Sequence, residues 1–413
     1  MKYYLAGGAV RNLLLGIKPA DLDFAFNGSE QEFIALNPLA RKLGGGPALL
    51  LGRNEYSPLR GEDLTEDLRK RDFTINALLL DENGVLHMHP DALRDLKAGC
   101  LEAASEDALT EDPLRVFRAA RFSAVFPELR VSEHCRNLLR ESASLEAFRN
   151  IAAERVGQEC LKALSGPCPG NFLRLLGETG TLTHWFKEFS GASGIPAGPV
   201  PYHNTDVLEH TAQIMDSTAA GFDSWRAGFG VLHEREAAEH IEQVRQAEQA
   251  AYAEIRQLSA WMALCHDLGK TGTPAEILPH HYKHELRGMK LASALALRLR
   301  LPERFRLAGV LASKLHMKAG VYFNLRPGTR VDLLMEVHAR KLIIPLFLLA
   351  QADSGNNALL GAACAELEMI KEVKLPNNLK NQGKISGQRL RELRCQRLGK
   401  LSEQCFSAPA WND

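Results

Sequence analysis

The hydrophobic pattern near the N-terminus of this 413-residue chain switches between strand-like and helix-like segments. The apolar run Tyr3–Ala6 predicts a short strand, and Gly7-Gly8 separates it from a helix expected over about Ala9–Leu15, which Gly16 ends. Polar and apolar residues then alternate with period two across Asp21–Phe26, which predicts a second strand. This region is therefore expected to mix strands and helices.

A hairpin signal follows, after which the strand pattern stops. Phe73–Asp81 and Val85–His89 flank Glu82-Asn83-Gly84, a sequence typical of a tight turn. From about residue 105 onward, apolar residues recur at helical intervals and predict a helical core. The recurring positions are Ala119, Phe122, Leu138, Leu139, Val156, Leu161, Leu164, Phe172 and Leu175. The predicted fold class is α+β, with a small mixed β-sheet followed by an all-helical body.

Two further segments stand out in the helical part. The Gly/Pro-rich stretch Gly191–Pro201 is the clearest break and our preferred domain boundary. Residues 232–255 form a charged, alanine-rich amphipathic pattern with six acidic residues against two arginines. A solvated helix is the simplest interpretation of that pattern.

Composition narrows the class of protein without identifying it. Apolar residues make up 45% and charged residues 24% of the chain, values typical of a globular protein. Lys plus Arg and Asp plus Glu both number 50, which excludes a uniformly basic surface but allows a local one. The eight cysteines form no CxxC pair, and neither a signal peptide nor an apolar run of about 18 residues is visible, so we expect a cytoplasmic protein.

The strongest chemical signal near the N-terminus is a pair of carboxylates, Asp21 and Asp23. Side chains two apart on a strand share one face, and two like charges held there favour a bound cation. Mg²⁺ or Mn²⁺ carrying substrate phosphates suits such a pair. Gly7-Gly8 leads into a helix whose free N–H groups favour phosphate, and Arg11 adds a charged donor. Either motif alone would be typical of an ordinary exposed turn or edge strand.

Four motifs in succession extend this picture. They are GGAVRN at residues 7–12, DLDF at 21–24, RDFTINA at 71–77 and EDPLR at 111–115. Their order and spacing resemble those of class II tRNA nucleotidyltransferases and bacterial poly(A) polymerases, from residue 3 to about 165. The resemblance implies a polymerase-β-like nucleotidyltransferase head at residues 1–110, followed by a helical base-reading neck at residues 111–195.

The resemblance assigns roles within the head. Asp21 and Asp23 would hold two catalytic Mg²⁺ ions for in-line attack of an RNA 3′-hydroxyl on the α-phosphate of a nucleoside triphosphate. Gly8 and Arg11 would lie at the triphosphate. The residues implied at the sugar and phosphates are Arg71, Asp72 and Asn76.

The EDPLR motif corresponds to the segment that reads the incoming base in this family. Asp112 and Arg115 are three residues apart and are expected on one helix face. A carboxylate accepts from the amino group of cytosine or adenine while an arginine donates, so such a pair admits C and A without a template. Arg118 continues this face at the nucleotide, as a structural residue or a phosphate contact, and a later motif around Arg155 braces it. Without the other motifs, Asp112 before Pro113 would be typical of a helix N-terminus.

Three departures from the family pattern bear on function. Asn12 stands in place of an aspartate, the segment 89–96 lacks two residues of the usual hinge motif, and only 48 residues separate Asp23 from Asp72. The usual flexible loop is compressed into residues 53–66, and loss of this loop is typical of relatives that add only the two cytidines. Addition of CC and of full CCA therefore both stay open. The candidates for a third metal-supporting carboxylate are Glu55, Glu62 and Asp63.

A second constellation lies in the helical body. His266-Asp267 ends the apolar segment WMALCHDLGK, and His210 and Asp353 flank it along the chain. This order resembles the HD phosphohydrolase superfamily, which some bacterial tRNA nucleotidyltransferases carry C-terminally, here at residues 196–365. It implies a transition metal such as Ni²⁺, Mn²⁺ or Fe²⁺ on these four residues. The further candidates, for a second metal or for phosphate, are His284 and His316. A single helical histidine would instead be typical of a hydrogen-bonded core.

The chain ends in a basic segment, with seven Lys or Arg residues against one acid between positions 375 and 402. It resembles the closing helix that lies along the tRNA in this family, and we place the RNA-binding tail at residues 366–413. Contacts with phosphates would be salt-sensitive and carry no base specificity. A solvated terminal helix is the alternative. The residues expected to bind RNA are Lys384, Arg389, Arg391, Arg394 and Arg397.

Together these features predict a tRNA nucleotidyltransferase that adds CCA, with an additional phosphohydrolase activity. The expected partners are the tRNA 3′ end, CTP and ATP, with no membrane and no obligate protein partner. The alternatives are an enzyme that adds only CC or only A, a poly(A) polymerase, and, in another class, an RNA-binding HD phosphohydrolase with an inactive transferase head.

Overall fold

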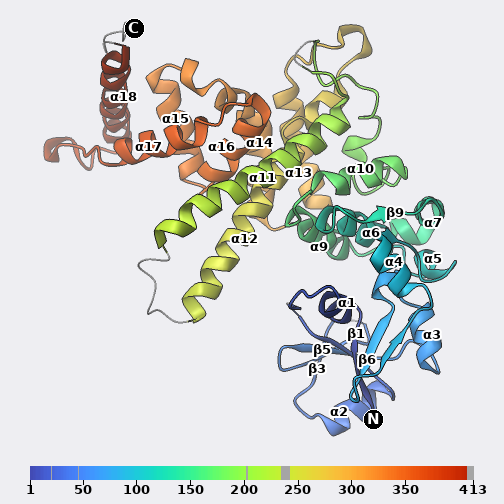
Figure 1. Cartoon of the computed structure of the whole chain (residues 1–413). Helices are drawn as coiled ribbons and strands as arrows, with labels where there is room; N and C mark the ends of the chain where they lie inside the picture. The colour runs from blue at the N-terminus through green and yellow to red at the C-terminus, as the bar shows by residue number, and fades with distance from the viewer. Residues whose placement is uncertain (20, 45, 201–202, 234–241, 407–413) are drawn as a thin grey trace, which may run out of the picture. The chain divides into compact units, whose positions relative to one another are not determined.

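The computed structural model describes residues 1–19, 21–44, 46–200, 203–233 and 242–406. The fold divides into two compact units, Met1–Arg155 with Glu178–Thr181, and Val156–Gly177 with Leu182–Asp413. The first unit holds the β-sheet and the second is helical, as Figure 1 shows, which confirms the predicted α+β class. The four predicted segments are finer than these two units, and their boundaries stay predictions.

A seven-stranded mixed sheet forms the centre of the first unit, in the order β3-β4-β5-β2-β1-β6-β7. Neighbouring strands are antiparallel except β2 and β5, which are parallel. The strands are β1 (Tyr3–Ala6), β2 (Asp23–Phe26), β3 (Arg41–Lys42), β4 (Leu49–Leu51), β5 (Asn54–Pro58), β6 (Leu78–Asp81) and β7 (Leu86–Met88). The first predicted strand is β1, and the predicted hairpin is formed by β6 and β7.

Short helices surround this sheet and continue past it along the chain. They are α1 (Gly8–Leu14), α2 (Glu30–Leu36), α3 (Leu64–Arg69), the 3₁₀ helix η1 (Thr74–Asn76), α4 (Ala92–Ala98), α5 (Ala108–Glu111), α6 (Arg115–Val125), α7 (Glu133–Ser144) and α8 (Glu146–Arg149). The helix predicted over residues 9–15 is α1, displaced by one residue, and Gly16 follows its end with φ +71°.

Side chains alternate across the sheet and give it two different faces. Phe24 on β2 stacks on Tyr56 of β5 with ring centroids 5.0 Å apart, and Phe33 of α2 packs against the same aromatic face. The opposite face packs small apolar side chains against α3. Asp23 and Glu55 neighbour the stacked rings in sequence and belong to this second face.

The structure corrects two element predictions in this unit. The strand predicted from Phe73 begins at Leu78, because residues 74–76 turn the backbone as η1 before the sheet starts. No strand was expected beyond residue 105, yet β9 (Arg130–Val131) pairs in parallel with β8 (Cys100–Leu101). A two-residue strand is too short to show a period in the sequence.

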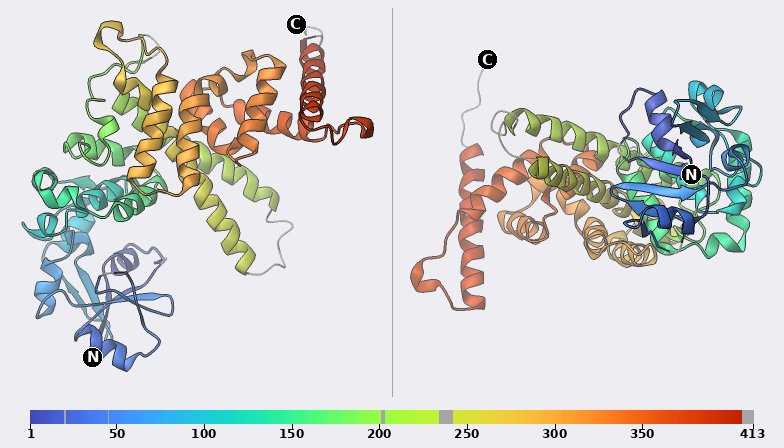
Figure 2. Two further views of the ribbon diagram at one scale, coloured as in Figure 1. Left: turned by 180° about the vertical axis from the view of Figure 1, so that it is seen from behind. Right: turned by 90° about the horizontal axis from the view of Figure 1, so that it is seen from below.

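The second unit consists of helices, several of which lie side by side. They are α9 (Ala153–Leu164, which starts in the first unit), α10 (Gly170–Glu178), η2 (Lys187–Phe189), α11 (Val207–His233), α12 (Glu242–Cys265), η3 (Leu268–Gly272), η4 (Ala275–Ile277), α13 (His284–Arg298), α14 (Glu303–Gly320), η5 (Tyr322–Asn324), α15 (Pro327–His338), α16 (Ile343–Ser354), α17 (Leu359–Lys371), η6 (Asn377–Leu379) and α18 (Lys384–Phe406). Figures 1 and 2 show the hairpin of α11 and α12. The helix predicted over 232–255 falls on parts of both, and residues 234–241 lie outside the described residues.

The helical spacing located the core correctly. All nine apolar positions predicted from it are buried, and Trp261, Tyr322 and Phe347 are among the largest fully buried side chains of the second unit. Across the described residues, none of the helices combines the length and the apolar character needed to cross a bilayer.

Candidate functional site

Strand pairing brings two carboxylates together on one face of the sheet. β2 and β5 run parallel with Asp23 opposite Glu55, and both residues are exposed. Since Phe24 and Tyr56 stack on the aromatic face, the two carboxylates lie on the opposite one. Glu55 is one of the three candidates for a third carboxylate, and its register favours it.

The other two candidates lie at the start of α3 instead. Asp63 caps that helix, because its Oδ1 accepts from the Glu66 backbone N–H at 2.8 Å. Glu62 donates its own backbone N–H to the Glu66 carboxylate at 2.7 Å. Neither lies on a strand beside Asp23.

Asp21 differs from its prediction, because it precedes β2 instead of lying on it. In this register Asp21 would fall opposite Arg53, which precedes the first residue of β5 and follows the turn at Gly52. Asp21 is exposed and two residues away from the pair formed by β2 and β5. Its role as a metal ligand stays a prediction.

The glycine turn joins β1 to α1 and requires glycine at its first position. Gly7 has φ +62°, a conformation that L side chains rarely adopt. A Cβ atom there would lie 3.4 Å from Nη1 of Arg71 and 3.7 Å from the Asn76 carbonyl oxygen. A Cβ on Gly8 would meet the guanidinium of Arg11 at 3.6 Å. The turn therefore brings two of the predicted arginines within van der Waals reach of the glycine backbone.

Arg11 is buried, and its hydrogen bonds go to neutral amides. Its Nη1 donates to Asn76 Oδ1 at 2.6 Å, while Nη2 and Nε donate to Asn12 Oδ1 at 2.9 and 3.2 Å. Burial and the charge of Arg121 lower the pKa of Arg11 to about 10, although Asp72 opposes this. Arg11 stays charged at neutral pH, and a buried cation held by neutral groups is suited to bind a phosphate.

Asp72 lies inside an arginine cluster. It is only 3% exposed, its Oδ2 pairs with Arg118 Nη2 at 2.8 Å, and its Oδ1 accepts from Asn76 Nδ2 at 3.2 Å and from the Phe73 N–H at 2.9 Å. Burial raises the pKa of this carboxyl, but Arg118 and Arg115 outweigh burial and lower it to about 2. Asp72 is therefore ionised, and its predicted contact with a ribose hydroxyl stays a prediction.

Sequence reasoning missed a second buried carboxylate, Asp67 of α3. Its Oδ2 accepts from Nε of Arg71 at 2.8 Å and lies 2.8 Å from Nη2, and its Oδ1 accepts from the Arg60 backbone N–H at 3.0 Å. The signal that could have found it is an acid four residues before a base, although Glu66 and Lys70 show the same spacing on the surface.

The predicted base-reading pair does not share a helix face, so that expectation is wrong. Asp112 is extended, with φ −134° and ψ 91°, because a residue before proline disfavours the helical conformation. Arg115 begins α6 and is buried. It donates to the backbone carbonyls of Lys70, Arg71 and Ala108. The roles of both residues at the base stay predictions.

Asp112 has a partner in the later helical motif. Its Oδ2 lies 3.1 Å from Nη2 of Arg155, and both side chains are partly exposed. The Asp112 Oδ1 accepts from the Leu114 N–H at 3.2 Å. Arg155 thus contacts the motif that it was expected to brace.

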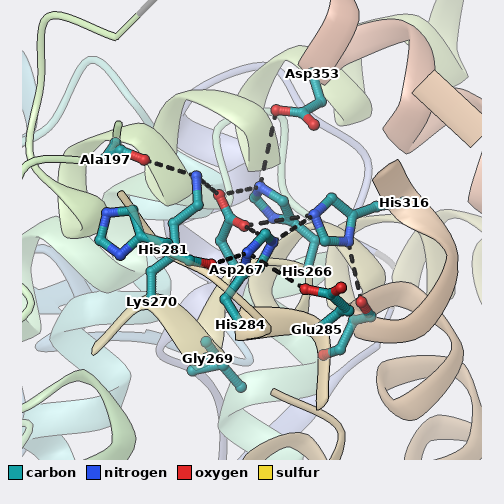
Figure 3. Close-up of polar contacts among 12 residues, drawn as sticks. Ala197, His266, Asp267, Gly269, Lys270, His281, His284, Glu285, His316 and Asp353 are labelled. Atoms are coloured by element: carbon teal, nitrogen blue, oxygen red, sulfur yellow. Dashed lines mark hydrogen bonds and ion pairs between the residues drawn. The ribbon is translucent and has the colours of Figure 1, made fainter. Parts of the chain in front are cut away.

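In the second unit, helices distant in sequence bring the predicted HD-type ligands together (Figure 3). His210 lies on α11, His266 and Asp267 follow α12, His284 begins α13, His316 lies on α14 and Asp353 lies on α16. The four histidines and Asp267 are buried. The sequence order therefore identified residues that share one place in the fold.

Four of these residues surround a common point. Asp267 Oδ2 lies 3.1 Å from His266 Nε2 and 3.4 Å from His210 Nε2. Asp353 Oδ1 lies 3.4 Å from the nitrogen of His210 and 3.9 Å from that of His266. Ligand atoms at ~2.1 Å from one ion lie about 3.0 Å apart at right angles and about 4.2 Å apart when opposite. The four distances fall within this range.

The other oxygen of Asp267 faces a second group. Oδ1 lies 3.4 Å from His284 Nε2 and 3.5 Å from His316 Nε2, and these two nitrogens are 3.2 Å apart. The Nδ1 atoms of His284 and His316 contact backbone carbonyls at 2.8 and 3.0 Å, as does Nδ1 of His266 at 2.6 Å. A carbonyl only accepts, so each Nδ1 carries the proton and each Nε2 presents a lone pair, as in metal-binding histidines.

The electrostatics of this cluster favour a cation. Nε2 of His210, Nε2 of His266 and Oδ1 of Asp267 are buried and make no hydrogen bond within the described part of the chain. Burial opposes the charge on Asp353, but contacts with His210 and His266 lower its pKa to about 2. Burial also opposes charge on His210, yet Asp267 and Asp353 raise its pKa to about 9. Ionised carboxylates with imidazole nitrogens are a donor set that fits the predicted transition metal.

Lys270 is also buried beside this cluster. Its Nζ lies 2.6 Å from Asp267 Oδ2 and donates to the Ala197 carbonyl at 2.7 Å (Figure 3). The lysine therefore anchors the carboxylate that both ligand groups share. Sequence reasoning had assigned it no role.

Part of the basic tail is engaged within the second unit. Arg391 of α18 pairs with Asp332 of α15 through Nε at 2.6 Å and Nη2 at 2.7 Å. Arg394 donates to the Ile370 carbonyl at 3.1 Å. These two arginines also hold α18 in place, so their predicted contact with RNA stays a prediction.

The other predicted tail residues are exposed. Arg389 pairs with Glu392 at 2.8 Å on the surface of α18. Lys384 and Arg397 are exposed on the same helix. A contact between these side chains and RNA also stays a prediction.

Two family models match separate parts of the chain. Residues 3–42 match the poly A polymerase head domain, and residues 128–192 match the probable RNA and SrmB-binding site of polymerase A. Proteins named multifunctional CCA protein match over most of the length. The one from Tolumonas auensis is 31% identical over 381 residues, which are 86% of this chain and 84% of that protein. The one from Legionella pneumophila strain Lens is 30% identical over 406 residues, covering 92% and 89%.

Solved structures share the fold at lower identity. The Thermotoga maritima CCA-adding enzyme complexed with tRNA is 20% identical with a TM-score of 0.58, covering 97% of this chain and 91% of that one. A complex of a CCA-adding enzyme with CTP is 19% identical with a TM-score of 0.60, covering 96% and 87%.

Proposed function

Because this chain belongs to the family of multifunctional CCA proteins, which are nucleotidyltransferases, we propose that it adds CMP and AMP to the 3′ end of tRNA from CTP and ATP. The observation that carries the proposal is the pairing of Asp23 with Glu55 on a sheet that also ends in the Gly7 turn. Carboxylates for metal ions and arginines for phosphates are the two requirements of metal-assisted phosphoryl chemistry.

The residues of the head suggest two separate roles, metal binding by the carboxylates and phosphate binding by the arginines. Mg²⁺ held by Asp21, Asp23 and Glu55 would activate the RNA 3′-hydroxyl and neutralise charge on the phosphates. Arg11 and Arg71 bind the triphosphate at the glycine turn and orient the α-phosphate for in-line attack, after which pyrophosphate leaves. No nucleic-acid template takes part in this scheme.

Product lengths test the proposal and separate its alternatives. A tRNA transcript that lacks CCA is incubated with CTP, with ATP, and with both nucleotides. Two added residues with CTP and three with both support full CCA addition. Two residues with both nucleotides indicate a CC-adding enzyme, and a long ladder with ATP indicates a poly(A) polymerase. A single A on a second transcript ending in CC, with no addition of C to the transcript that lacks CCA, indicates an A-adding enzyme.

A matched pair of variants links the activity to the carboxylates. Asp23→Ala should abolish CTP incorporation, because Asp23 faces Glu55. Glu30→Ala removes an acid from α2, whose Phe33 packs on the aromatic face of the sheet, and should leave incorporation unchanged. Full activity of Asp23→Ala would contradict the assignment.

We propose a second activity for the histidine and aspartate cluster, hydrolysis of 2′,3′-cyclic phosphates or phosphomonoesters. The observation in its favour is a set of buried atoms that could bind a metal and that lack hydrogen bonds, on His210, His266 and Asp267. A transition metal held by these residues and Asp353 would supply an activated water when bound. Asp267 would be shared with a second ion on His284 and His316.

Metal content and hydrolysis test this second proposal separately. The purified protein should contain a transition metal by mass spectrometry, and His266→Ala should lose most of it. His338→Ala removes a histidine of α15 outside the cluster and should retain the metal. Hydrolysis of a cyclic nucleotide without CTP incorporation would instead favour the alternative of an RNA-binding phosphohydrolase with an inactive head.

We also propose a cytoplasmic location for this activity. Seven cysteines, Cys100, Cys135, Cys160, Cys168, Cys265, Cys364 and Cys395, are free, as expected in a reducing compartment. Recovery of the protein with the cytoplasmic fraction of cells would support this location, and recovery elsewhere would contradict it.

A further inference from the structure

Helix α3 carries two ion pairs with the same spacing and opposite environments. Glu66 pairs with Lys70 on the surface, where the side chains are 42% and 39% exposed. Asp67 pairs with Arg71 in the interior, where the side chains are 1% and 9% exposed. Burying two charges costs desolvation that their attraction often fails to recover, so a buried pair is weak evidence of a role in stability. The Asp67–Arg71 pair therefore calls for another explanation.

The geometry of the pair fixes one orientation of the guanidinium. Asp67 Oδ2 accepts a hydrogen bond from Arg71 Nε at 2.8 Å and lies 2.8 Å from Nη2 of the same guanidinium. Asp67 Oδ1 is itself held by the Arg60 backbone N–H at 3.0 Å. The remaining nitrogen, Nη1, lies over Gly7, 3.4 Å from the position that a Cβ atom would take there.

Neighbouring charges make this restraint necessary. Arg115 donates to the carbonyl of Arg71 itself at 3.2 Å, and Arg11 is buried near the same turn. Like charges in a desolvated site repel, so Arg71 would move away from the turn unless a carboxylate held it. Asp67 supplies that carboxylate from the side opposite Nη1.

We propose that Asp67 is a positioning residue for nucleotide addition, which holds Arg71 so that Nη1 meets the phosphates of the incoming nucleotide at the Gly7 turn. This inference rests on the proposed transferase function. Asp67 touches no substrate and acts through Arg71 alone. It should therefore affect nucleotide binding much more than the chemical step.

Asp67→Asn is the informative variant, because it keeps the size of the side chain and an acceptor for Arg60 but removes the charge. We expect the KM for CTP to rise roughly tenfold or more, the loss typical of a charge-assisted hydrogen bond, with kcat changed by less than about threefold. Glu66→Gln removes the charge of the exposed pair one residue earlier and should leave both constants unchanged. Asp67→Glu keeps the charge but displaces it, and should give an intermediate KM.

A double variant separates positioning from a structural role. If Asp67 acts through Arg71, Asp67→Asn should add no further loss in KM to Arg71→Ala, whereas independent structural damage would add. An unchanged KM in Asp67→Asn, or in Asp67→Glu if the first variant does not fold, would overturn the inference. The inference would also be overturned if Asp67→Asn raised the KM by the same factor in the wild type and in the Arg71→Ala variant. Failure of the wild-type protein to extend tRNA would instead overturn the proposed function itself.

Discussion

The two predicted metal sites of this chain are built in opposite ways. In the first unit, Asp21, Asp23 and Glu55 are exposed, and strand pairing places Asp23 beside Glu55. In the second unit, the four histidines and Asp267 are buried, Asp353 is partly buried, and Asp267 Oδ2 lies 3.1 Å from His266 Nε2. Under the proposed functions, the exposed site would bind ions together with substrate phosphates and release them, while the buried cluster would retain its ion.

The energetics of burial explain why a bound ion would stabilise the second arrangement more than the first. An unpaired charge or lone pair inside a protein costs several kcal/mol, whereas an exposed carboxylate remains hydrated at little cost. Nε2 of His284 and Nε2 of His316 face each other at 3.2 Å, which is unfavourable without a proton or a metal between them. Asp23 and Glu55 need no such compensation before the substrate arrives.

Metal removal should give the largest effect and the clearest test of this contrast. Brief dialysis against EDTA should lower CTP incorporation to background, roughly a thousandfold or more, and added Mg²⁺ should restore it at once. The transition metal should remain bound through the same dialysis, because all its predicted ligands except the partly exposed Asp353 are buried. Mass spectrometry and the incorporation assay measure the two sites in one sample.

His266→Ala is the complementary control for that experiment. It should lose the resident metal while Mg²⁺-dependent CTP incorporation persists, since the two sites lie in different compact units. If the wild-type protein lost Mg²⁺ and the transition metal at the same rate, the distinction between an exchanging site in the first unit and a resident site in the second would be wrong.

A glycine substitution should give the next largest effect, in the exposed site. Gly7 and Gly16 both have positive φ, +62° and +71°, so alanine at either should cost about 1 kcal/mol in the free energy of unfolding. Only at Gly7 would the Cβ contact a charged donor, since it would lie 3.4 Å from Arg71 Nη1, an ordinary van der Waals distance, while nothing lies within 4 Å at Gly16. We expect Gly7→Ala to raise the KM for CTP roughly tenfold, by filling the space beside Nη1 that a phosphate would occupy. Equal kinetics in the two variants would show that Arg71 does not bind at this turn.

The same contrast explains what could be predicted from the sequence. The residues of the buried cluster could be selected because their order along the chain is itself the signal, and His210, His266, Asp267 and Asp353 do lie close together, while their role as metal ligands stays a prediction. The partner of Asp23 could not be chosen among three acids, because strand register is a long-range property. Only the structure pairs Asp23 with Glu55.

The errors have local physical causes. Asp112 was expected on the helix face of Arg115, but the proline after it keeps its backbone extended. Asp67 was overlooked because the neighbouring Glu66 has the same spacing to a base, and only packing decides which of the two pairs is buried. Periodicity predicts elements and core positions well, whereas the burial of a charge depends on the tertiary structure.

The pH dependence of stability should show that arginines, and not a metal ion, stabilise the buried charge of Asp72 in the first unit. Asp72 has a pKa of about 2 in the folded chain, below the usual value of 3.8. Its depressed pKa contributes about 2 kcal/mol to the free energy of unfolding above about pH 4, and this contribution is lost as the pH falls through about 2. The stability difference between wild type and Asp72→Asn should therefore be constant from pH 5 to 8 and shrink below pH 4.

Chemical denaturation at each pH measures that difference. EDTA should not change it, because Arg118 and Arg115 rather than a metal stabilise the charge of Asp72. Asp63→Asn is the control, since it replaces an exposed helix cap with another good cap. If EDTA changed the stability difference between wild type and Asp72→Asn, a metal ion rather than the arginines would be stabilising the charge of Asp72.

The smallest effects are expected on α18. Some of its arginines are paired within the second unit and others are exposed, and we expect the exposed ones to contribute more to RNA binding. Arg397→Ala should weaken tRNA binding about two- to threefold and reduce the salt slope by about one, because Arg397 is exposed. Asp332→Ala should strengthen binding about twofold and steepen the slope, because it frees Arg391 from a pair at 2.6 Å. Filter binding across a range of salt concentrations measures both. If neither variant changes the slope, α18 is a solvated terminal helix, and the available charges that bind tRNA lie elsewhere on the chain.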